Sequence, residues 1–411
     1  DLAKKIIYPF IGDFMSVSEL SLIIDKSYST FRKKNVVDLI KLGDTKVLEL
    51  FHGPTLAFKD VAMQLLGNFY EFYLSKNSKN INIIVATSGD TGAAAIDAIK
   101  GKKNVNIFVL HPHNKVSPVQ RKIMSTVKEN NVFNIAIEGN FDDCQNLVKA
   151  MFADKDFSNS INMSGVNSIN WARIIAQAVY YFYTYFLIKD KKSINFSVPT
   201  GNFGDVYAGY LSKKMGLPIN KLIVATNKND ILHRAISTGK YDVETVFETN
   251  SPSMDIQVAS NFERYLYFEF GQAPEKVKEF MEDFSSTGLA TTAFNTLNFD
   301  AAFTSGRVSD EDTVATIART FEETEYLLDP HTAVGVGVGQ VKRRPEVPLV
   351  CLATAHPSKF DEVIRQVIPD VEVSHPTLEL LKDLPERKTL LEGEVDVVKD
   401  FISTFNDQLA S

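Results

Sequence analysis

Short apolar runs rich in β-branched residues alternate with helical patterns along this chain, and the alternation limits the folds it can adopt. INIIVAT begins at Ile81, and NVNIFVL and VFNIAIEG follow it after amphipathic segments. INFSV at 194–198, KLIVATN at 221–227 and PLVCLAT at 348–354 repeat the pattern. Such alternation is typical of parallel sheets joined by crossover helices. The sequence therefore predicts an α/β fold of mostly parallel sheets with helices on both faces, and 411 residues suffice for two domains.

Composition excludes several classes of function. A net charge of −7 disfavours nucleic acid as a partner, because nucleic-acid binding usually needs a basic face. The longest apolar stretch, 174–188, contains Gln177 and is shorter than the ~20 residues that cross a bilayer, so we expect a buried helix and no membrane partner. Cys144 and Cys351 are far apart in sequence and form no CxxC pattern, which predicts a reducing, cytoplasmic location without disulfides or structural zinc.

The segment TSGDTG follows the first predicted strand and opens a helix. Its small residues leave backbone N–H groups open to an anion, and the hydroxyls of Thr87, Ser88 and Thr91 add further donors. An equally good interpretation is a helix N-terminus that Ser88 or Asp90 caps. The segment alone does not distinguish the two.

PTGNFGD occupies the same position after the strand at 194–198. Gly201 and Gly204 allow the backbone to curl so that successive N–H groups converge, which forms a phosphate site that needs no lysine. The alternative is a tight connecting turn. The order of strand, turn and helix favours phosphate binding.

HGPTLAFKD places Lys59 at the start of an amphipathic helix. A lysine against an apolar wall loses affinity for its proton and becomes an amine that can form a Schiff base. Most single lysines are solvated, however, so the residue by itself favours a surface position. Only the surrounding motif can reverse that interpretation.

Three other patterns have simpler structural interpretations. His111 and His113 are expected in a polar loop, and without an HExxH pair they predict no metal site. The glycines of GVGVGQ at 335–340 lack the full dinucleotide-binding spacing and indicate close helix packing. The aromatic run at 180–186 continues a helix, so we expect it in the core.

HGPTLAFKD, TSGDTG, NSINWARIIAQ, PTGNFGD, DPHTAVG and TAHPSKF occur in this order between about Val47 and Lys359, and together they resemble the threonine synthase family. That family belongs to the tryptophan-synthase-β class of pyridoxal-phosphate (PLP) folds, which have a smaller and a larger lobe. The resemblance implies a smaller α/β lobe at 55–170 with the substrate-binding turn, and a larger lobe at 1–54 and 171–411 with the cofactor-phosphate loop.

The resemblance also implies cofactor-binding residues. The Schiff-base lysine of the family falls on Lys59, which reverses the expectation of a solvated side chain. Thr354, in TAHP, matches the threonine that meets the pyridine nitrogen. Asp90 replaces the asparagine of many members of the wider class, which favours threonine synthase over cysteine synthase. The cofactor-phosphate loop corresponds to Gly201, Asn202, Phe203, Gly204 and the backbone near Asp205.

The implied substrate is O-phospho-L-homoserine, which the family converts with water to L-threonine and phosphate, as a carbon–oxygen lyase acting on phosphate. The serine and arginine of NS-x-N-x-x-R, here Ser168 and Arg173, match residues that hold the substrate phosphate. The planar guanidinium of Arg173 suits phosphate oxygens. The other implied phosphate contacts are Thr87, Ser88, Thr91 and Asn202.

In the implied mechanism, Lys59 performs most proton transfers during γ-elimination and β-addition. Two alternatives stay open at this stage. The chain could be another eliminating PLP enzyme, such as a threonine dehydratase, or a catalytically silent protein that resembles threonine synthase. The oligomeric state is expected to be a monomer or a homodimer.

Overall fold

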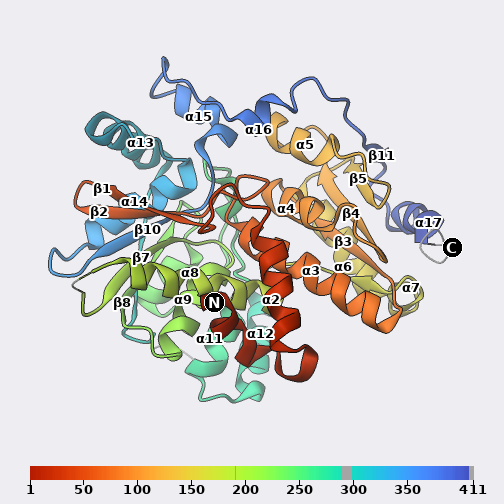
Figure 1. Ribbon diagram of the computed structural model, residues 1–411, viewed down its shortest axis with the longest axis horizontal. Helices are drawn as coiled ribbons and strands as arrows, with labels where there is room; N and C mark the ends of the chain where they lie inside the picture. Colours follow the sequence, from red (N-terminus) through yellow and green to blue (C-terminus); the bar gives the residue numbers. More distant parts are fainter. Residues whose placement is uncertain (190, 289–298, 407–411) are drawn as a thin grey trace. The chain divides into compact units, whose positions relative to one another are not determined.

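A computed structural model describes residues 1–189, 191–288 and 299–406, which fall into two compact units (Figure 1). Unit 1 comprises Asp1–Phe10, Asn35–His52 and Ile174–Val373. Unit 2 comprises Ile11–Lys34, Gly53–Arg173 and Ser374–Ser411.

Unit 1 contains a six-stranded sheet. Its strand order is β1-β2-β10-β7-β8-β9, in which only β1 and β2 pair antiparallel. The strands are β1 (Asp38–Leu42), β2 (Thr45–Glu49), β7 (Ile194–Pro199), β8 (Ile219–Thr226), β9 (Phe303–Arg307) and β10 (Leu349–Ala353). The predicted strands at 194–198, 221–227 and 348–354 are the three central ones, which are buried on both faces and therefore give continuous apolar runs.

Helices cover both faces of this sheet. They are α1 (Leu2–Ile7), α8 (Trp171–Leu187), α9 (Gly204–Lys214), α10 (Ile231–Thr238), α11 (Phe262–Glu269), α12 (Pro274–Thr287), α13 (Asp310–Thr324), α14 (Pro330–Lys342) and α15 (Asp361–Arg365). On one face, a Cβ at Gly335 would lie 2.9 Å from Pro199 Cγ and one at Gly339 would lie 3.0 Å from Ser197 Cβ. The GVGVGQ glycines thus let α14 approach β7 closely, as predicted.

The opposite face of β7 packs against α8. Tyr181 is fully buried, and its ring lies 4.9 Å from that of Phe196 in an edge-on arrangement. The predicted buried helix and core position of the aromatic run are therefore confirmed for Tyr180 and Tyr181. Phe186, at the end of the run, is exposed instead.

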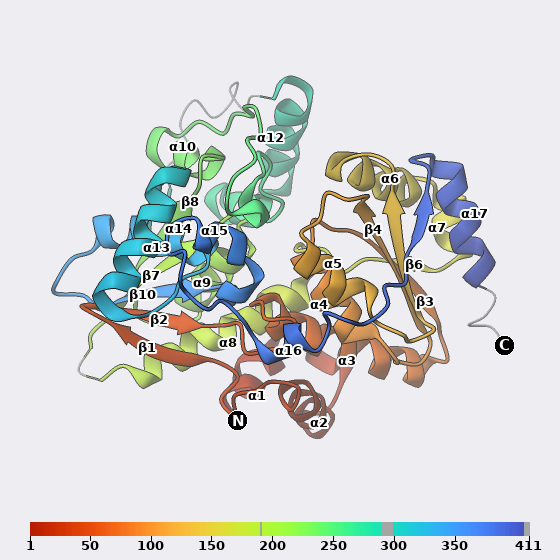
Figure 2. The same ribbon diagram turned by 90° about the horizontal axis from the view of Figure 1, so that it is seen from above.

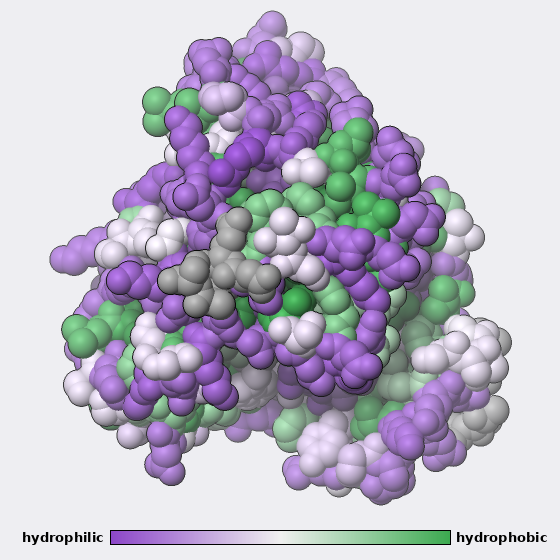
Figure 3. All heavy atoms as spheres, turned by 90° about the vertical axis from the view of Figure 1, so that its right-hand side faces the viewer, coloured by the Kyte–Doolittle hydropathy of each residue, from purple (hydrophilic) through white to green (hydrophobic). Residues whose placement is uncertain are grey.

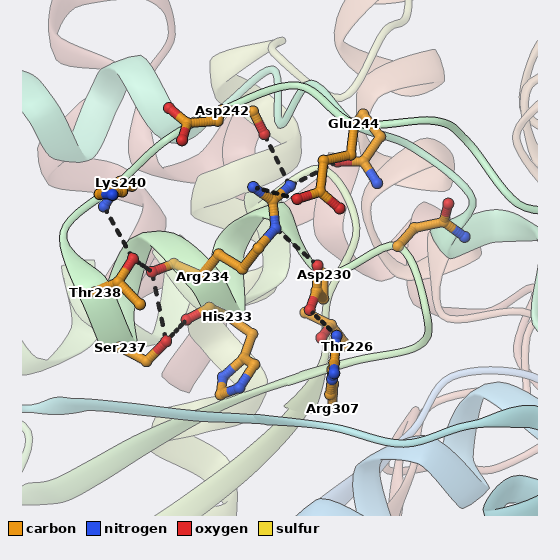
Figure 4. A network of polar contacts seen from close by, with 12 residues as sticks. Thr226, Asp230, His233, Arg234, Ser237, Thr238, Lys240, Asp242, Glu244 and Arg307 are labelled. Carbon is orange, nitrogen blue, oxygen red and sulfur yellow. Dashed lines mark hydrogen bonds and ion pairs between the residues drawn. The ribbon is translucent and has the colours of Figure 1, made fainter. Parts of the chain in front are cut away.

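Polar side chains fix the loop that follows α10 in unit 1 (Figure 4). Arg234 Nε donates to Asp230 Oδ1 at 2.9 Å and Nη2 donates to the carbonyl oxygen of Asp242 at 2.8 Å. Arg307, from β9, donates to the second carboxylate oxygen of Asp230 at 2.7 Å. Because Asp230 is buried, the two guanidinium groups compensate its charge and tie α10 to the edge strand.

Unit 2 contains an all-parallel sheet of order β11-β5-β4-β3-β6. Its strands are β3 (Ile81–Ala86), β4 (Val105–Pro112), β5 (Val132–Ile137), β6 (Met163–Ser164) and β11 (Thr389–Leu391). Its helices are α2 (Val17–Tyr28), α3 (Lys59–Asn77), α4 (Asp90–Ile99), α5 (Pro118–Ser125), α6 (Phe141–Ala153), α7 (Lys155–Ser160), α16 (Pro376–Glu379) and α17 (Val395–Asn406). In Figure 2, α3, α4 and α5 lie on one face of this sheet, and α6 and α17 lie on the other.

The predicted lobe boundaries are wrong in four places. Residues 11–34, 53–54, 171–173 and 374–411 were assigned to the larger lobe, but they belong to unit 2. β11 pairs with β5, which precedes it by about 250 residues, and Lys26 Nζ of α2 lies 2.6 Å from Glu71 Oε2 of α3. Such long-range pairings leave no local pattern in the sequence.

His111 also departs from its predicted place in a polar loop. It is a residue of β4 and only 2% exposed, and neither ring nitrogen has a hydrogen-bond partner among the described residues. Burial lowers the pKa of His111, so the neutral imidazole is the form that the sheet accommodates.

Hydrophilic residues make up most of the molecular face in Figure 3, with smaller apolar areas between them. Within the described ranges, no helix is both long and apolar enough to cross a bilayer.

Candidate active site

Lys59 is the first residue of α3 and is only 8% exposed. The loop before it is held by Asp60, whose carboxylate accepts from Thr55 N at 2.8 Å and from Thr55 Oγ1 at 2.6 Å. A Cβ at Gly53 would lie 2.4 Å from Asp60 Cβ, so this loop admits only glycine there. Leu56 has a left-handed backbone (φ 62°), which is uncommon for a residue other than glycine. HGPTLAFKD thus builds a rigid, buried turn that ends at the lysine.

The surroundings of Lys59 combine an apolar wall with one carboxylate. Its Nζ lies 5.0 Å from the ring centroid of Phe58 and 3.4 Å from Asp90 Oδ2. Asp90 is 3% exposed and comes from the first turn of α4. The simple solvated interpretation of Lys59 is therefore wrong, and a buried amine lies beside a buried acid.

The TSGDTG turn is stabilised from within. Thr87 Oγ1 accepts from Gly89 N at 3.0 Å and from Gly92 N at 2.8 Å. Gly89 is the N-cap residue of α4 with φ 144°, a backbone conformation that favours glycine. Neither Ser88 nor Asp90 caps the helix, so that alternative is wrong. An anion at this turn would also meet fewer backbone N–H groups than predicted, because those of Gly89 and Gly92 already donate to Thr87.

The remaining side chains of this turn differ in exposure. Ser88 is exposed and Thr91 is half-buried, so both hydroxyls are more accessible than that of Thr87, which is buried.

Ser168 precedes α8 and Arg173 lies in its first turn; both residues belong to unit 2, whereas the rest of α8, from Ile174, belongs to unit 1. β6 pairs with β3, which brings the start of this segment beside the strand that carries TSGDTG. Ser168 is half-buried and Arg173 is buried, with Nη1 of Arg173 donating to the carbonyl oxygen of Val166 at 3.1 Å. One guanidinium nitrogen thus anchors the head group to the segment before α8.

The GNFG turn in unit 1 follows β7 and begins α9. Phe203 is its N-cap residue with a left-handed backbone (φ 62°). The Phe203 ring is buried, with centroids of Phe262 and Phe303 at 5.6 and 5.7 Å. A Cβ at Gly201 would lie 3.1 Å from Ser253 O, so a side chain there would crowd the backbone behind the turn. Phe203 anchors the turn, which leaves its backbone N–H groups, and not its ring, to meet a ligand.

The two polar residues of the loop point in different directions. Asn202 is exposed, and its side-chain oxygen accepts from Ser260 Oγ at 3.1 Å. The carboxylate of Asp205 is turned into the protein, where it accepts from the hydroxyls of Tyr180 and Tyr181. Burial raises the pKa of Asp205 to about 6, although both tyrosine hydrogen bonds act to lower it. Asp205 can therefore contribute to a ligand site only through its backbone.

Thr354 follows β10 and is supported by residues that sequence reasoning left without a role. Its N–H donates to Thr332 Oγ1 at 3.2 Å, and the Thr332 hydroxyl donates to Asp329. His331 lies between Asp329 Oδ1, at 3.0 Å, and Ser253 N, which donates to Nε2 at 3.2 Å. Ser253 also lies against the GNFG turn, because a Cβ at Gly201 would be 3.1 Å from Ser253 O. The DPHTAVG segment therefore connects Thr354 with the turn at Gly201, and both are predicted cofactor contacts. An aspartate followed by a proline is a common signal for the start of a helix, so the capping role of Asp329 could have been predicted from the sequence.

His52, at the start of HGPTLAFKD, belongs to a second polar group in unit 1. Ligand atoms of Asp38, Glu49 and His52 lie within 4.8 Å of one another, a spacing that could hold a metal ion. His52 Nε2 lies 2.9 Å from Glu49 Oε2, and the hydroxyl of Tyr326 donates to Glu49 Oε1 at 2.8 Å. These hydrogen bonds give the group a structural role between β1, β2 and the segment before α14.

Comparison with known proteins identifies the family of this chain. The threonine synthase of Pseudomonas aeruginosa is 47% identical over 408 residues, which cover 98% of this chain and 87% of that relative. This chain belongs to the threonine synthase family. Within it, residues 47–348 match the family of pyridoxal-phosphate dependent enzymes, and residues 332–402 match the C-terminal region of threonine synthase.

Solved structures of threonine synthases have the same fold. The PLP-bound enzyme from Brucella melitensis has a TM-score of 0.93 and 43% identity, over 98% of this chain and 88% of that one. The yeast threonine synthase has a TM-score of 0.92 and 39% identity, over 99% and 88%. The predicted fold class, the family and its dependence on PLP are confirmed.

Proposed function

We propose that this protein converts O-phospho-L-homoserine and water to L-threonine and phosphate with PLP as cofactor. Membership of the threonine synthase family supports the reaction. The observation that carries the proposal is Lys59, an amine buried beside Asp90 and Phe58 at the start of α3. Burial keeps this amine away from bulk water, so that, once unprotonated, it can act as the nucleophile toward a carbonyl group.

The residues present fit PLP. When bound, PLP supplies an aldehyde that bonds to an amine and a ring that delocalises negative charge from the substrate Cα. Lys59 offers the amine to which the cofactor attaches. The GNFG turn offers the uncapped N-terminus of α9, whose first N–H groups have no helical carbonyl to bind. A side chain at Gly201 would crowd this turn, in keeping with a cradle that a phosphate can approach closely.

Thr354 is proposed to hold the pyridine nitrogen through its hydroxyl. A neutral hydroxyl can hydrogen-bond this nitrogen without requiring it to be charged. The link from Thr354 through Thr332 and Asp329 to His331 fixes the backbone of this threonine. In this role the buried carboxylate of Asp329 supports the site and does not contact the substrate.

Arg173, Ser168, Ser88 and Thr91 are proposed to hold the substrate phosphate. The guanidinium group of Arg173 supplies charge and paired donors, and the three hydroxyls supply neutral hydrogen bonds. Thr87 keeps a smaller part in this proposal, because its oxygen accepts two backbone N–H groups and only its own proton remains to donate.

Lys59 is also proposed to move the protons of the reaction. The unprotonated Lys59 amine could take a proton from the substrate Cα and return protons during the loss of phosphate from Cγ and the addition of water at Cβ. Asp90, 3.4 Å from Nζ, orients the amine and stabilises it whenever it is protonated.

Incubation with O-phospho-L-homoserine tests the reaction. The purified holoenzyme should release phosphate and threonine in equal amounts, and Lys59→Ala should release neither. Phosphate without threonine, or threonine consumption that gives a keto acid, would contradict the proposal and favour a dehydratase-like enzyme.

We also propose a cytoplasmic enzyme that is a monomer or homodimer. Cys144 and Cys351 are free and buried, and burial raises the pKa of each thiol to about 12, so neither is reactive. Fractionation of cells that express the whole protein tests the location, and light scattering of the purified protein tests the mass.

A further inference from the structure

A glutamine outside every recognised motif lies against the TSGDTG turn. Gln120 belongs to α5 and is 4% exposed. Its Nε2 donates to Asp90 Oδ1 at 3.0 Å, while Asp90 Oδ2 lies 3.4 Å from Lys59 Nζ. Amide, carboxylate and amine therefore form a continuous buried chain within unit 2.

The orientation of the Gln120 amide is determined by its neighbours. Ser117, the N-cap residue of α5, donates its hydroxyl to Gln120 Oε1 at 3.2 Å. With Oε1 used as an acceptor, Nε2 is the atom that faces Asp90. Gly89 permits this approach, because a Cβ there would lie 2.4 Å from Gln120 Oε1.

The hydrogen bond from Gln120 acts on the charge of Asp90. A donor to a carboxylate favours its ionised form, and a buried carboxylate that loses its donor tends to become protonated or to turn away. At 3% exposure, water has little access to Asp90 and cannot easily replace the amide. An ionised Asp90 beside Lys59 stabilises the ammonium form of the lysine.

A purely structural role for Gln120 makes a different prediction. If the side chain only connects α5 to α4, its loss lowers the free energy of unfolding and leaves the protonation of Lys59 unchanged.

We propose that Gln120 is a positioning residue that acts through Asp90. Its amide keeps the carboxylate ionised and directed at Nζ, and thereby sets the pH range in which Lys59 gains and loses its proton. The inference rests on the proposed function, because it takes Lys59 as the reacting amine.

The test measures the protonation of Lys59 directly. The full-length protein, freed of PLP, is treated with limiting acetic anhydride across a pH series, and acetylation of Lys59 is quantified by mass spectrometry. Gln120→Met keeps the side-chain volume but removes the donor. We expect the midpoint pH of Lys59 labelling to fall by about one unit, since a nearby opposite charge typically shifts such a group by 1 to 3 units. A midpoint equal to that of the wild type overturns the inference.

Gln120→Leu provides a second variant if Gln120→Met does not fold. It removes the same donor, so the midpoint of Lys59 labelling should again fall. A midpoint equal to that of the wild type contradicts the inference.

Gln64→Met is the matched control. Gln64 Nε2 donates to Asp97 Oδ2 at 2.7 Å, which is a partly buried amide–carboxylate bond in the same unit with a different acceptor from Asp90. In this variant the midpoint pH of Lys59 labelling should equal that of the wild type, and a fall like that of Gln120→Met would overturn the inference.

Borohydride reduction of the wild-type holoenzyme distinguishes failure of this inference from failure of the proposed function. If Lys59 carries no PLP after reduction, the proposed function fails. If Lys59 carries PLP and the midpoint in Gln120→Met is unshifted, only the role of Gln120 is rejected.

Discussion

The turn at 87–92 in unit 2 and the turn at 199–205 in unit 1 occupy equivalent places, each after a parallel strand and before a helix. The first is held by a hydroxyl, because Thr87 Oγ1 binds two of its own N–H groups. The second is held from behind by the buried ring of Phe203 and leaves its backbone donors available. Similar strings of small residues thus produce two different surfaces.

This difference indicates how each turn can bind an anion. A turn that retains its N–H groups can cradle phosphate with backbone alone, which suits a cofactor that stays in place. A turn that has used two of them needs side chains, and the proposed donors in unit 2 are Ser88, Thr91 and the guanidinium group of Arg173. Side-chain donors suit a phosphate group that must arrive and leave.

The comparison also separates the two units chemically. Unit 2 contains the amine that we propose to react, together with its carboxylate, whereas the turn in unit 1 is proposed to bind through neutral groups. Lys59→Ala should therefore have the largest effect on catalysis, with a fall in kcat of about 10²- to 10⁴-fold or more. Steady-state release of threonine measures the loss, and near-normal activity of a folded Lys59→Ala protein would contradict the assignment.

Phe203→Ala removes the anchor of the turn in unit 1. Loss of a buried aromatic ring typically costs about 3–5 kcal/mol, and the turn loses its support at the same time. We expect lower stability in denaturant titration together with weaker binding of PLP. Phe108→Ala is the control, since Phe108 is equally buried in unit 2; it should lose stability and retain cofactor affinity. Equal affinities in both variants would show that the ring does not shape the turn.

Asp205→Asn tests the burial of the carboxyl group beneath the same turn. Folding raises the pKa of Asp205 from an ordinary 3.8 to about 6, so between these values the folded chain binds a proton that the unfolded chain lacks. The Asp205 contribution to stability therefore falls as the pH rises from about 4 to about 6, and the loss is complete above pH 6. A shift of two units corresponds to roughly 3 kcal/mol.

Asparagine keeps an acceptor for Tyr180 and Tyr181 without the charge. Asp205→Asn should thus be more stable than the wild type at pH 8, and the difference should shrink toward pH 4. Urea titrations at both pH values measure it. A variant that is less stable than the wild type at pH 8 would show that the ionised carboxylate strengthens the tyrosine contacts by more than its burial costs.

Thr87→Val should give the smallest effect. The change keeps the shape of the side chain but leaves Gly89 N and Gly92 N without their acceptor, which costs about 1–3 kcal/mol. Freed N–H groups could bind the substrate phosphate directly, so we expect lower stability with little increase in the KM for O-phospho-L-homoserine. A large rise in KM at unchanged stability would instead indicate that the hydroxyl of Thr87 contacts the substrate.

Local patterns were enough to predict the central strands and the place of each motif. β3, β7 and β10 are buried on both faces, so their apolar runs are long and visible in the sequence. β1, β2, β9 and β11 lie toward the edges of their sheets, carry mixed residues and were missed. The partners of β9 and β11 are distant in sequence, so no local window contains them, whereas β1 and β2 form a hairpin across Gly43 and Asp44 that a local pattern could have predicted.

The sequence predicts the parts of the site in which a motif requires a particular backbone conformation. It predicts less well which side chains form hydrogen bonds with each other. The helix start at Lys59 and the strand, turn and helix order at Gly201 follow from local sequence. The inward turn of the Asp205 carboxylate depends on Tyr180 and Tyr181. The hydrogen bond of Gln120 to Asp90 likewise joins two helices, and glutamine in an amphipathic helix gives no distinguishing signal.

The proposed function depends on a covalent bond between Lys59 and PLP, and peptide mapping identifies the lysine that forms it. Borohydride reduction of the holoenzyme fixes the cofactor to the amine that bears it, and mass spectrometry of the digest identifies that residue. We expect a single pyridoxyl group on the peptide that contains Lys59. A pyridoxyl group on another lysine, or none on any peptide of a PLP-saturated and active enzyme, would contradict it.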